Sequence, residues 1–223
     1  MPADSALIEY YARRANEYER IYAKPERQND LHVLRQWLRA KCARHEVLEV
    51  ACGTGYWTET IAAIANSVTA VDINREVLEI ARRKSFPRRN VSFEQQDVYR
   101  LTLNANHFTA GLAAFWWSHI PKARVKMFLQ HFHLNLSPDA LVVFVDNRYV
   151  EDSSRPVSRH DDEGNSYQLR TLDDGSRHEV LKNFPTETEL RNAVEEFARD
   201  IEYRALDYYW CLVYRLKSNS STS

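Results

Sequence analysis

The spacing of apolar residues changes character near residue 46. Before that point, residues 7–21 and a segment that starts at Asn29-Asp30 repeat apolar positions at helical intervals, which predicts two amphipathic helices separated by Pro25. After it, short β-branched and aliphatic runs alternate with longer amphipathic stretches. The expected strands are 46–51, 68–73, 91–95, 108–115 and 140–146, and the expected helices are 56–65, 74–84 and 122–136. This alternation predicts an α/β fold with a doubly wound, Rossmann-like sheet.

The pattern changes again after Asp146. Residues 151–165 are polar and predict a long loop, and Asp174-Gly175 predicts a β-hairpin because this pair suits the positive φ angles of tight turns. The hairpin strands are expected at 166–172 and 178–182, followed by a helix over 186–199 and two strands at 201–206 and 208–216. The register stays open. A two-residue turn directs Arg170 and Lys182 to opposite faces, and a three-residue loop directs both to one face.

Length and composition favour a single globular domain. The 223 residues are 44% hydrophobic and 27% charged, and the 30 Lys and Arg against 31 Asp and Glu give a net charge of -1. This balance argues against a general attraction to nucleic acid, so no nucleic-acid partner is expected. The three cysteines have no metal-binding or disulfide pattern, which predicts no metal and a cytoplasmic location. No signal peptide or membrane span is expected, and the chain is expected to be a monomer or homodimer.

The first candidate site lies in residues 47–58, where a buried strand leads through a turn of small residues into a helix. Gly53 and Gly55 allow a ligand to lie against the backbone, and the helix N-terminus offers unpaired N–H groups. Ala51 replaces the first glycine of the dinucleotide pattern, which argues against NAD. Taken alone, the segment is equally compatible with an ordinary tight turn between a strand and a helix.

Acidic residues end the next two expected strands. Asp72 follows the glycine loop by about twenty residues, the spacing at which a carboxylate accepts both hydroxyls of a ribose. Capping of the next helix is the alternative role for Asp72. Asp97 can accept the exocyclic amine of adenine, and Val98 can offer its backbone N–H to the ring. The fourth strand ends in the aromatic segment 115–119, which can cover a bound cofactor or can be ordinary packing.

In this order, the segments resemble the class I S-adenosylmethionine (SAM)-dependent methyltransferases over essentially the whole chain. The resemblance implies a seven-stranded methyltransferase sheet, SAM as cofactor and methyl transfer to a small molecule. It also implies that Glu49 orders the glycine loop and that Ile73 packs on the adenine. The positions that it assigns to the cofactor are Glu49, Ala51, Cys52, Gly53, Thr54, Gly55, Trp57, Asp72, Ile73, Gln96, Asp97, Val98, Phe115 and Trp116.

A closer resemblance is to small-molecule phosphonate O-methyltransferases of the kind that acts in dehydrophos biosynthesis. It is carried by segments around Tyr10-Tyr11, 51–58, His119-Ile120-Pro121 and Arg170-Thr171-Leu172. It implies that residues 1–27 form a lid helix over SAM and that residues 147–185 form a substrate-side loop and hairpin. Three lid residues are thereby expected near SAM: Tyr11, Arg14 and Tyr18. The alternative is an amphipathic helix whose tyrosines pack at the edge of the core.

The methyl acceptor is less well defined than the cofactor. The candidate substrate-binding residues are Trp117, Asn147, Arg148, Tyr167, Arg170 and Lys182. Arg170 and Lys182 match basic residues that are expected to hold an oxyanion, although a solvated strand face is the alternative. His119 is the candidate catalytic base, needed only if the acceptor is a hydroxyl or an ammonium, and it can instead hydrogen-bond a loop carbonyl. We therefore expect O-methylation of an anionic phosphonate or carboxylate. N- or S-methylation of a small amine or thiol and a non-catalytic SAM-binding module are the alternatives.

Overall fold

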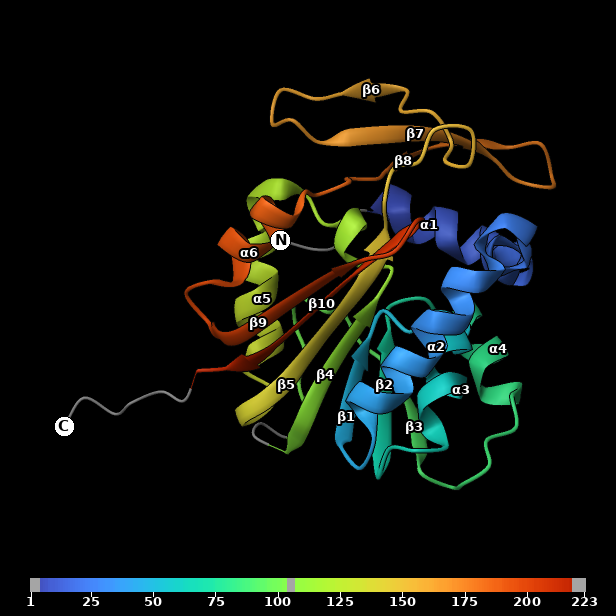
Figure 1. Cartoon of the computed structure of the whole chain (residues 1–223). Coiled ribbons are helices and arrows are strands. Elements are labelled where there is room, and N and C mark those ends of the chain that lie inside the picture. Colours follow the sequence, from blue (N-terminus) through green and yellow to red (C-terminus); the bar gives the residue numbers. More distant parts are fainter. Residues whose placement is uncertain (1–4, 104–106, 218–223) are drawn as a thin grey trace.

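A seven-stranded sheet forms the centre of the computed structural model, which describes residues 5–103 and 107–217 (Figure 1). Its strand order is β3-β2-β1-β4-β5-β10-β9, and β10 runs antiparallel to both of its neighbours. The strands are β1 (Glu46–Val50), β2 (Ser67–Asp72), β3 (Val91–Gln95), β4 (Phe108–Ala114), β5 (Leu136–Asn147), β9 (Ala198–Ala205) and β10 (Tyr209–Leu216). The predicted Rossmann-like fold, with its seven-stranded methyltransferase sheet, is confirmed.

Helices cover both faces of this sheet (Figure 1). One face carries α2 (Gln28–Cys42), α3 (Tyr56–Ala62) and α4 (Arg75–Arg83), and the other carries α5 (Val125–His133) and α6 (Glu187–Val194). The apolar stripe of α2 is fully buried, since Leu31, Leu34 and Leu38 have no exposed surface. Burial of such stripes stabilises the packed layers by about 25 cal/mol for each Å² of apolar surface that is removed from water.

The N-terminal segment combines two kinds of helix. The α-helix α1 (Ser5–Arg14) continues into the 3₁₀ helices η1 (Ala15–Ala23) and η2 (Pro25–Arg27), whereas the sequence predicts one helix over 7–21. Apolar spacing over so short a stretch does not distinguish the two windings. Leu7 and Tyr10 of α1 pack against Leu172 and Val180 of the hairpin. No helix among the described residues is long and apolar enough to cross a membrane.

The hairpin belongs to a second, three-stranded antiparallel sheet at one end of the molecule (Figure 1). It consists of β6 (Arg159–His160), β7 (Ser166–Thr171) and β8 (Arg177–Leu181), and the sequence analysis did not predict β6. Thr171 opposes Arg177, and the N–H of Leu172 donates to the carbonyl of Ser176, so a three-residue loop over 173–175 closes the hairpin. Arg170 opposes His178, which leaves Arg170 and Lys182 on the same face, as the three-residue alternative predicts.

Candidate active site

Sharp turns follow β1 and β4 at the carboxyl edge of the sheet. Ala51 and Phe115 have φ angles of 52° and 62°, in the left-handed region that favours glycine. Gly55 begins α3 with a φ of 76°, and a Cβ on it would lie 3.1 Å from the Cβ of Ala81. The turns direct the chain away from the sheet immediately after each strand, and this opens a hollow above the strand ends.

Two adjoining cavities occupy this edge. The first cavity lies above the carboxyl ends of β1, β2 and β4, the edge at which sheets of this kind bind their ligands. It is lined by Leu7, Ile8, Tyr11, Tyr18, Ala51, Gly53, Asp72, Ile73, Asn74, Val77, Asp97, Val98, Ala114, Phe115, Trp116 and His119. Ten of the predicted cofactor residues are therefore brought together, as is His119. Five further residues line this cavity without having been predicted: Leu7, Ile8, Asn74, Val77 and Ala114. In the sequence they are distinguished only by lying in or next to a predicted segment.

Asp72 connects β2 to the glycine loop. One carboxylate oxygen accepts the N–H of Gly53 at 2.8 Å, and the other accepts the N–H of Asn74 at 2.9 Å. Burial raises the pKa of Asp72, and these backbone donors oppose the rise. Asp72 thus lines the first cavity and holds the backbone of Asn74, the residue before α4, but it does not cap that helix, because α4 has no side-chain cap hydrogen bond among the described residues.

Glu49 lies behind the glycine loop and outside the first cavity. Its side chain is buried, with 1% exposed, and its carboxylate accepts a hydrogen bond from the Thr58 hydroxyl at 2.6 Å. Burial raises the pKa of Glu49 to about 8. Glu49 therefore connects β1 to α3 across the loop, an arrangement that agrees with the ordering role implied by the family resemblance.

Six other predicted cofactor residues lie outside the first cavity, because side chains along a strand, turn and helix point in different directions. Arg14 lines the second cavity described below. The Thr54 hydroxyl donates to Glu19, and Gln96 bonds Glu94 and Thr102. Cys52 and Trp57 are buried, and Gly55 packs against Ala81. Trp57 stacks on Phe115 at 5.6 Å between ring centroids, so it supports the cavity wall from behind.

The second cavity lies between α1, η1, the hairpin and the loop that follows β5. Its lining includes six cationic side chains, which are Arg14, Lys24, Arg27, Arg155, Arg170 and Lys182. Glu17 is the only acidic residue among the described residues that line it. Of the predicted substrate residues, Asn147, Arg170 and Lys182 line this cavity. The sequence analysis did not single out Lys24, Arg27 and Arg155, which only the folded chain brings near the hairpin.

Three predicted substrate residues lie outside both cavities. Trp117 is 4% exposed and packs edge-on against Phe144 and Trp210 in the core, so ordinary packing is the correct interpretation. The guanidinium of Arg148 donates to the carbonyl of Leu206. Tyr167 donates to Asp161 and points away from Arg170, because neighbouring β7 side chains alternate between faces.

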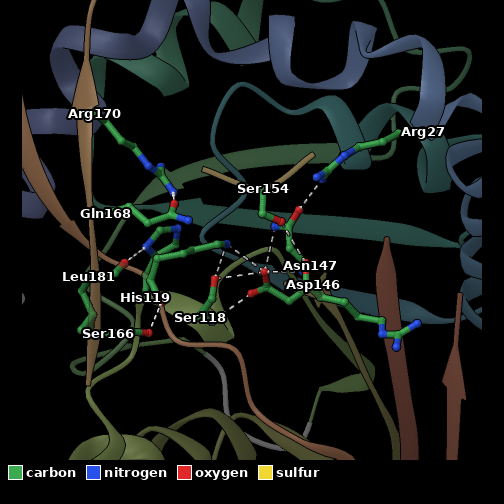
Figure 2. A network of polar contacts seen from close by, with 12 residues as sticks. Arg27, Ser118, His119, Asp146, Asn147, Ser154, Ser166, Gln168, Arg170 and Leu181 are labelled. Carbon is green, nitrogen blue, oxygen red and sulfur yellow. Dashed lines mark hydrogen bonds and ion pairs between the residues drawn. The ribbon is translucent and has the colours of Figure 1, made fainter. Parts of the chain in front are cut away.

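Arg170 is a buried cation. It is 9% exposed, and its guanidinium donates to the side-chain oxygen of Gln168 at 3.0 Å (Figure 2). It also donates to the Tyr10 hydroxyl at 3.4 Å. Among the described residues, its Nε has no hydrogen-bond partner and no carboxylate forms an ion pair with it. Because a buried charge is costly unless it is paired, this guanidinium is suited to receive an anion.

Lys182 differs from Arg170 because it has a buried counter-ion. Its ammonium donates to Asp146 at 3.1 Å and to the Ser118 hydroxyl at 2.5 Å. Asp146 has no exposed surface and also accepts the backbone N–H groups of Ser118 and Asn147, which extends the network in Figure 2 towards Arg27. Burial, helped by Arg170 and Arg14, lowers the pKa of Lys182 to about 8, and Asp146 opposes this change.

The wall between the cavities consists of the residues that line both, namely Tyr11, Tyr18, Phe115 and His119. Nδ1 of His119 lies 2.7 Å from the carbonyl oxygen of Leu181, which can only accept, so Nδ1 carries the proton. The Tyr11 hydroxyl therefore donates to Nε2, at 2.7 Å. Burial holds the pKa of His119 well below its usual value, and Lys182 and Arg170 lower it further. The imidazole is neutral, and both ring nitrogens are hydrogen-bonded, one of them to a loop carbonyl.

Comparisons with known proteins agree on one family. Residues 47–139 match the family described as "Methyltransferase domain". Malonyl-[acyl-carrier protein] O-methyltransferase from Bacillus cereus is 30% identical over 108 residues, which are 47% of this chain and 38% of that protein. Demethylmenaquinone methyltransferase from Staphylococcus aureus is 29% identical over 101 residues, 44% of this chain and 41% of that protein. The chain thus aligns with less than half the length of these two curated relatives.

Solved structures extend the likeness to nearly the whole chain. A complex of DhpI with SAM and HEP superposes with a TM-score of 0.78 and 29% identity, covering 96% of this chain and 99% of that one. A DhpI complex with SAH also has a TM-score of 0.78, with 28% identity over 95% of this chain and 96% of that one. The likeness to a phosphonate O-methyltransferase of dehydrophos biosynthesis, inferred from the sequence, agrees with these matches.

The first cavity fits SAM. Asp72 and Asp97 lie at the ends of adjacent strands, where carboxylates can accept ribose hydroxyls and an adenine amine. Gly53 presents no side chain, and its nearest neighbour to an added Cβ, Tyr18, is 3.9 Å away. Apolar side chains from α1 and β4 supply the remaining wall. The fold, the first cavity and the comparisons together support a class I SAM-dependent methyltransferase: residues 47–139 match a methyltransferase domain, and the neighbours that cover nearly the whole chain are complexes with SAM or SAH.

Proposed function

We propose that this chain transfers the methyl group of SAM to an oxygen of a small anionic acceptor, a phosphonate or a carboxylate, held in the second cavity. One observation carries the proposal: the buried guanidinium of Arg170 lines that cavity and has no carboxylate partner among the described residues. An arginine fork suits the paired oxygens of such an acceptor. The structural match to a DhpI complex that holds SAM and HEP supports the same choice.

The chain's contribution to catalysis is mainly to position the acceptor and exclude water. SAM, when bound, supplies an electrophilic methyl group on a positively charged sulfur. Arg170 and Arg14 hold the anion against the shared wall, and Tyr11 and Phe115 keep water out of the space between the two ligands. Orientation of this kind can supply roughly 7–11 kcal/mol of barrier reduction.

An anionic acceptor oxygen needs no base, and the geometry of His119 agrees with that. Both nitrogens of its ring are engaged, so His119 would have to release Tyr11 before it accepted a proton through Nε2. We therefore assign His119 a positioning role, in which it fixes the Tyr11 hydroxyl in the shared wall. The proposed lid, of which residues 5–27 are described, and the segment 147–185 enclose the acceptor together.

The other acceptor classes have less support. An ammonium acceptor would be repelled by the cations of the second cavity. Two acids that could bind an ammonium are already engaged, Asp146 with Lys182 and Asp161 with Asn165 and Tyr167. A non-catalytic SAM-binding module would not need an acceptor cavity beside the first one. The cytoplasmic location and the oligomeric state stay predictions.

The test is a methyl-transfer assay with isotopically labelled SAM and a panel of small acceptors, comprising alkylphosphonates, carboxylates, phenols, amines and thiols. We expect labelled methyl esters of the phosphonates or carboxylates and no methylated amine or thiol. Calorimetric titration with SAM accompanies the assay. Methylation restricted to amines or thiols would contradict the proposal, and SAM binding without turnover of any acceptor would favour the non-catalytic module.

A further inference from the structure

The cations of the second cavity form two groups. The inner group, Arg14, Arg170 and Lys182, lies beside the shared wall, since Arg14 is 5.2 Å from the Tyr18 ring and Arg170 and Lys182 act on the pKa of His119. The outer group consists of Lys24, which lies between η1 and η2, Arg27 at the end of η2, and Arg155 in the loop after β5. Figure 2 shows Arg170 and Arg27 on opposite sides of the polar network. Lys24 lies beside Arg27, since both donate to Ser153, and Arg155 follows Ser153 by two residues.

Arg27 gives the outer group a fixed framework. It is 7% exposed, and its guanidinium donates to the side-chain oxygen of Asn147 at 3.1 Å and to the Ser153 hydroxyl at 3.0 Å. The rings of Tyr208 and Tyr209 lie 5.0 and 5.7 Å from it. Arg27 therefore holds the loop after β5 in place with most of its donors already engaged.

Lys24 and Arg155 are available to a ligand. The ammonium of Lys24 donates to the Ser153 carbonyl at 2.6 Å and lies 3.7 Å from the carboxylate of Glu26, which is outside the cavity lining. The guanidinium of exposed Arg155 has no hydrogen-bond or ion-pair partner among the described residues, and its own backbone carbonyl is fixed by Gln168 at 2.6 Å. Two cations thus face the same end of the cavity with one peripheral acid to balance them.

Glu26 relieves only part of the mutual repulsion within the outer group. Burial lowers the pKa of Lys24, and Arg27 and Arg155 lower it further, whereas Glu26 alone opposes the change. An anion placed against Lys24 and Arg155 would remove this repulsion. A simple monoanionic acceptor at the inner group leaves this repulsion in place.

We infer that the natural acceptor carries two anionic groups: the one that is methylated, held by the inner group, and a distal carboxylate or comparable anion, held by Lys24 and Arg155. This inference rests on the proposed function, because it places the first anion at Arg170. It defines the substrate class as a bifunctional small molecule, not a simple alkylphosphonate. Specificity for the distal anion arises from the segment between η1 and η2 and from the loop after β5. The hairpin binds the anionic group that is methylated.

The experiment compares three acceptors: methylphosphonate, 3-phosphonopropionate and its neutral amide, 3-phosphonopropionamide. Kinetics with SAM give kcat/KM for each, and calorimetric titration in the presence of S-adenosylhomocysteine gives binding without turnover. We expect kcat/KM for the acid to exceed that for the amide at least about tenfold, which corresponds to about 1.4 kcal/mol. Lys24→Gln and Arg155→Gln should each reduce this acid-to-amide ratio about fivefold, or about 1 kcal/mol, both in kcat/KM and in affinity.

Lys126→Gln is the matched control. Lys126 lies on α5, outside both cavities, and forms an exposed ion pair with Glu196, so the substitution removes one positive charge away from the site. It should leave the acid-to-amide ratio unchanged. Since Lys24 also holds the Ser153 carbonyl, Arg155→Gln is the variant that separates charge from loop structure, and thermal denaturation checks both. Equal kcat/KM and equal affinity for acid and amide in the unsubstituted protein would overturn the inference while the proposed function stands. Failure to methylate these three phosphonates and the carboxylates of the acceptor panel, with SAM bound, would overturn both.

Discussion

Replacing Arg170 by methionine should lower kcat/KM for the acceptor while the free energy of unfolding stays the same or rises. The guanidinium is 9% exposed, lines the second cavity and has no carboxylate partner among the described residues. Methionine retains an unbranched apolar side chain that can occupy the same channel but carries no charge and no donors. The substitution therefore removes the proposed anion-binding group and, at the same time, a buried cation that the unliganded protein leaves uncompensated.

The magnitudes follow from the surroundings of Arg170. An acceptor oxyanion at about 4 Å in an environment of effective dielectric constant near 20 gains about 4 kcal/mol from one cation. Removal of one partner of a buried charge pair costs about 2–5 kcal/mol in measured complexes. We therefore expect kcat/KM for methylphosphonate to fall about 30- to 700-fold, equivalent to about 2–4 kcal/mol. Folding should be unaffected or more favourable by about 1–2 kcal/mol, since hydrophobic replacement of buried charges is often neutral or stabilising.

Three measurements separate these effects. Steady-state kinetics with labelled SAM give kcat/KM for the acceptor, calorimetry gives SAM affinity, and urea denaturation gives the free energy of unfolding without ligand. SAM affinity should change little, because Arg170 does not line the first cavity. Arg170→Lys is the companion variant: it restores the charge without the planar fork, and we expect it to recover only part of the lost activity.

Two results would refute this reasoning. An Arg170→Met protein that is folded, binds SAM and methylates phosphonates at the original rate would show that Arg170 does not hold the acceptor. A loss of several kcal/mol in the free energy of unfolding would show that Arg170 is a structural residue whose hydrogen bonds to Tyr10 and Gln168 outweigh its burial cost.

Three further predictions concern the cofactor side. Asp72→Ala should weaken SAM binding at least about tenfold in calorimetry, because Asp72 lines the first cavity and orients Gly53, and an unchanged affinity would contradict our placement of SAM. Ala51→Gly should raise the free energy of unfolding in urea by about 0.5–1 kcal/mol, since alanine there is held at a φ of 52°, and a lower value would show that the Cβ makes compensating contacts. Between about pH 4.5 and 8, Glu49 stays protonated in the folded chain, whereas the unfolded chain has lost that proton. Its contribution to stability is therefore present below this window and is lost as pH rises through it. Glu49→Gln should make the slope of unfolding free energy against pH more positive by up to about 1.4 kcal/mol per unit in this window, and identical slopes would show that Glu49 is ionised when folded.

Local patterns were sufficient to predict the sheet and the cofactor end of the site. The strands of the parallel half are short apolar runs bounded by turns, and Asp72 and Asp97 occur at their carboxyl ends, so sequence position alone places them at one edge. The hairpin and the capping box of α6, from Thr186 to Glu189, were also predictable from neighbouring residues. Ends were less accurate: α6 ends at Val194 and β9 begins at Ala198, within the helix expected up to 199.

The acceptor end depended on tertiary contacts that the sequence does not reveal. Trp117 follows a strand in the same aromatic run as Trp116, but it packs in the core while Trp116 lines the first cavity. The direction of Tyr167 followed from the hairpin register, which the turn sequence left open. Lys24 and Arg27 looked like ordinary solvated charges, and only the packing of η1 and η2 against the loop after β5 brings them to the acceptor.

The two cavities are lined by different parts of the chain, and this difference affects how such a protein can evolve. The described residues that line the first cavity all precede Ile120, whereas the second cavity also draws on residues 147–184. This later stretch is inserted between β5 and α6, and Lys182 and Asn183 fasten it to Asp146 and Ser118. A lineage could therefore exchange the insertion and acquire a new acceptor while it inherited the methyl-donor half unaltered, provided that this small fastening survived the exchange.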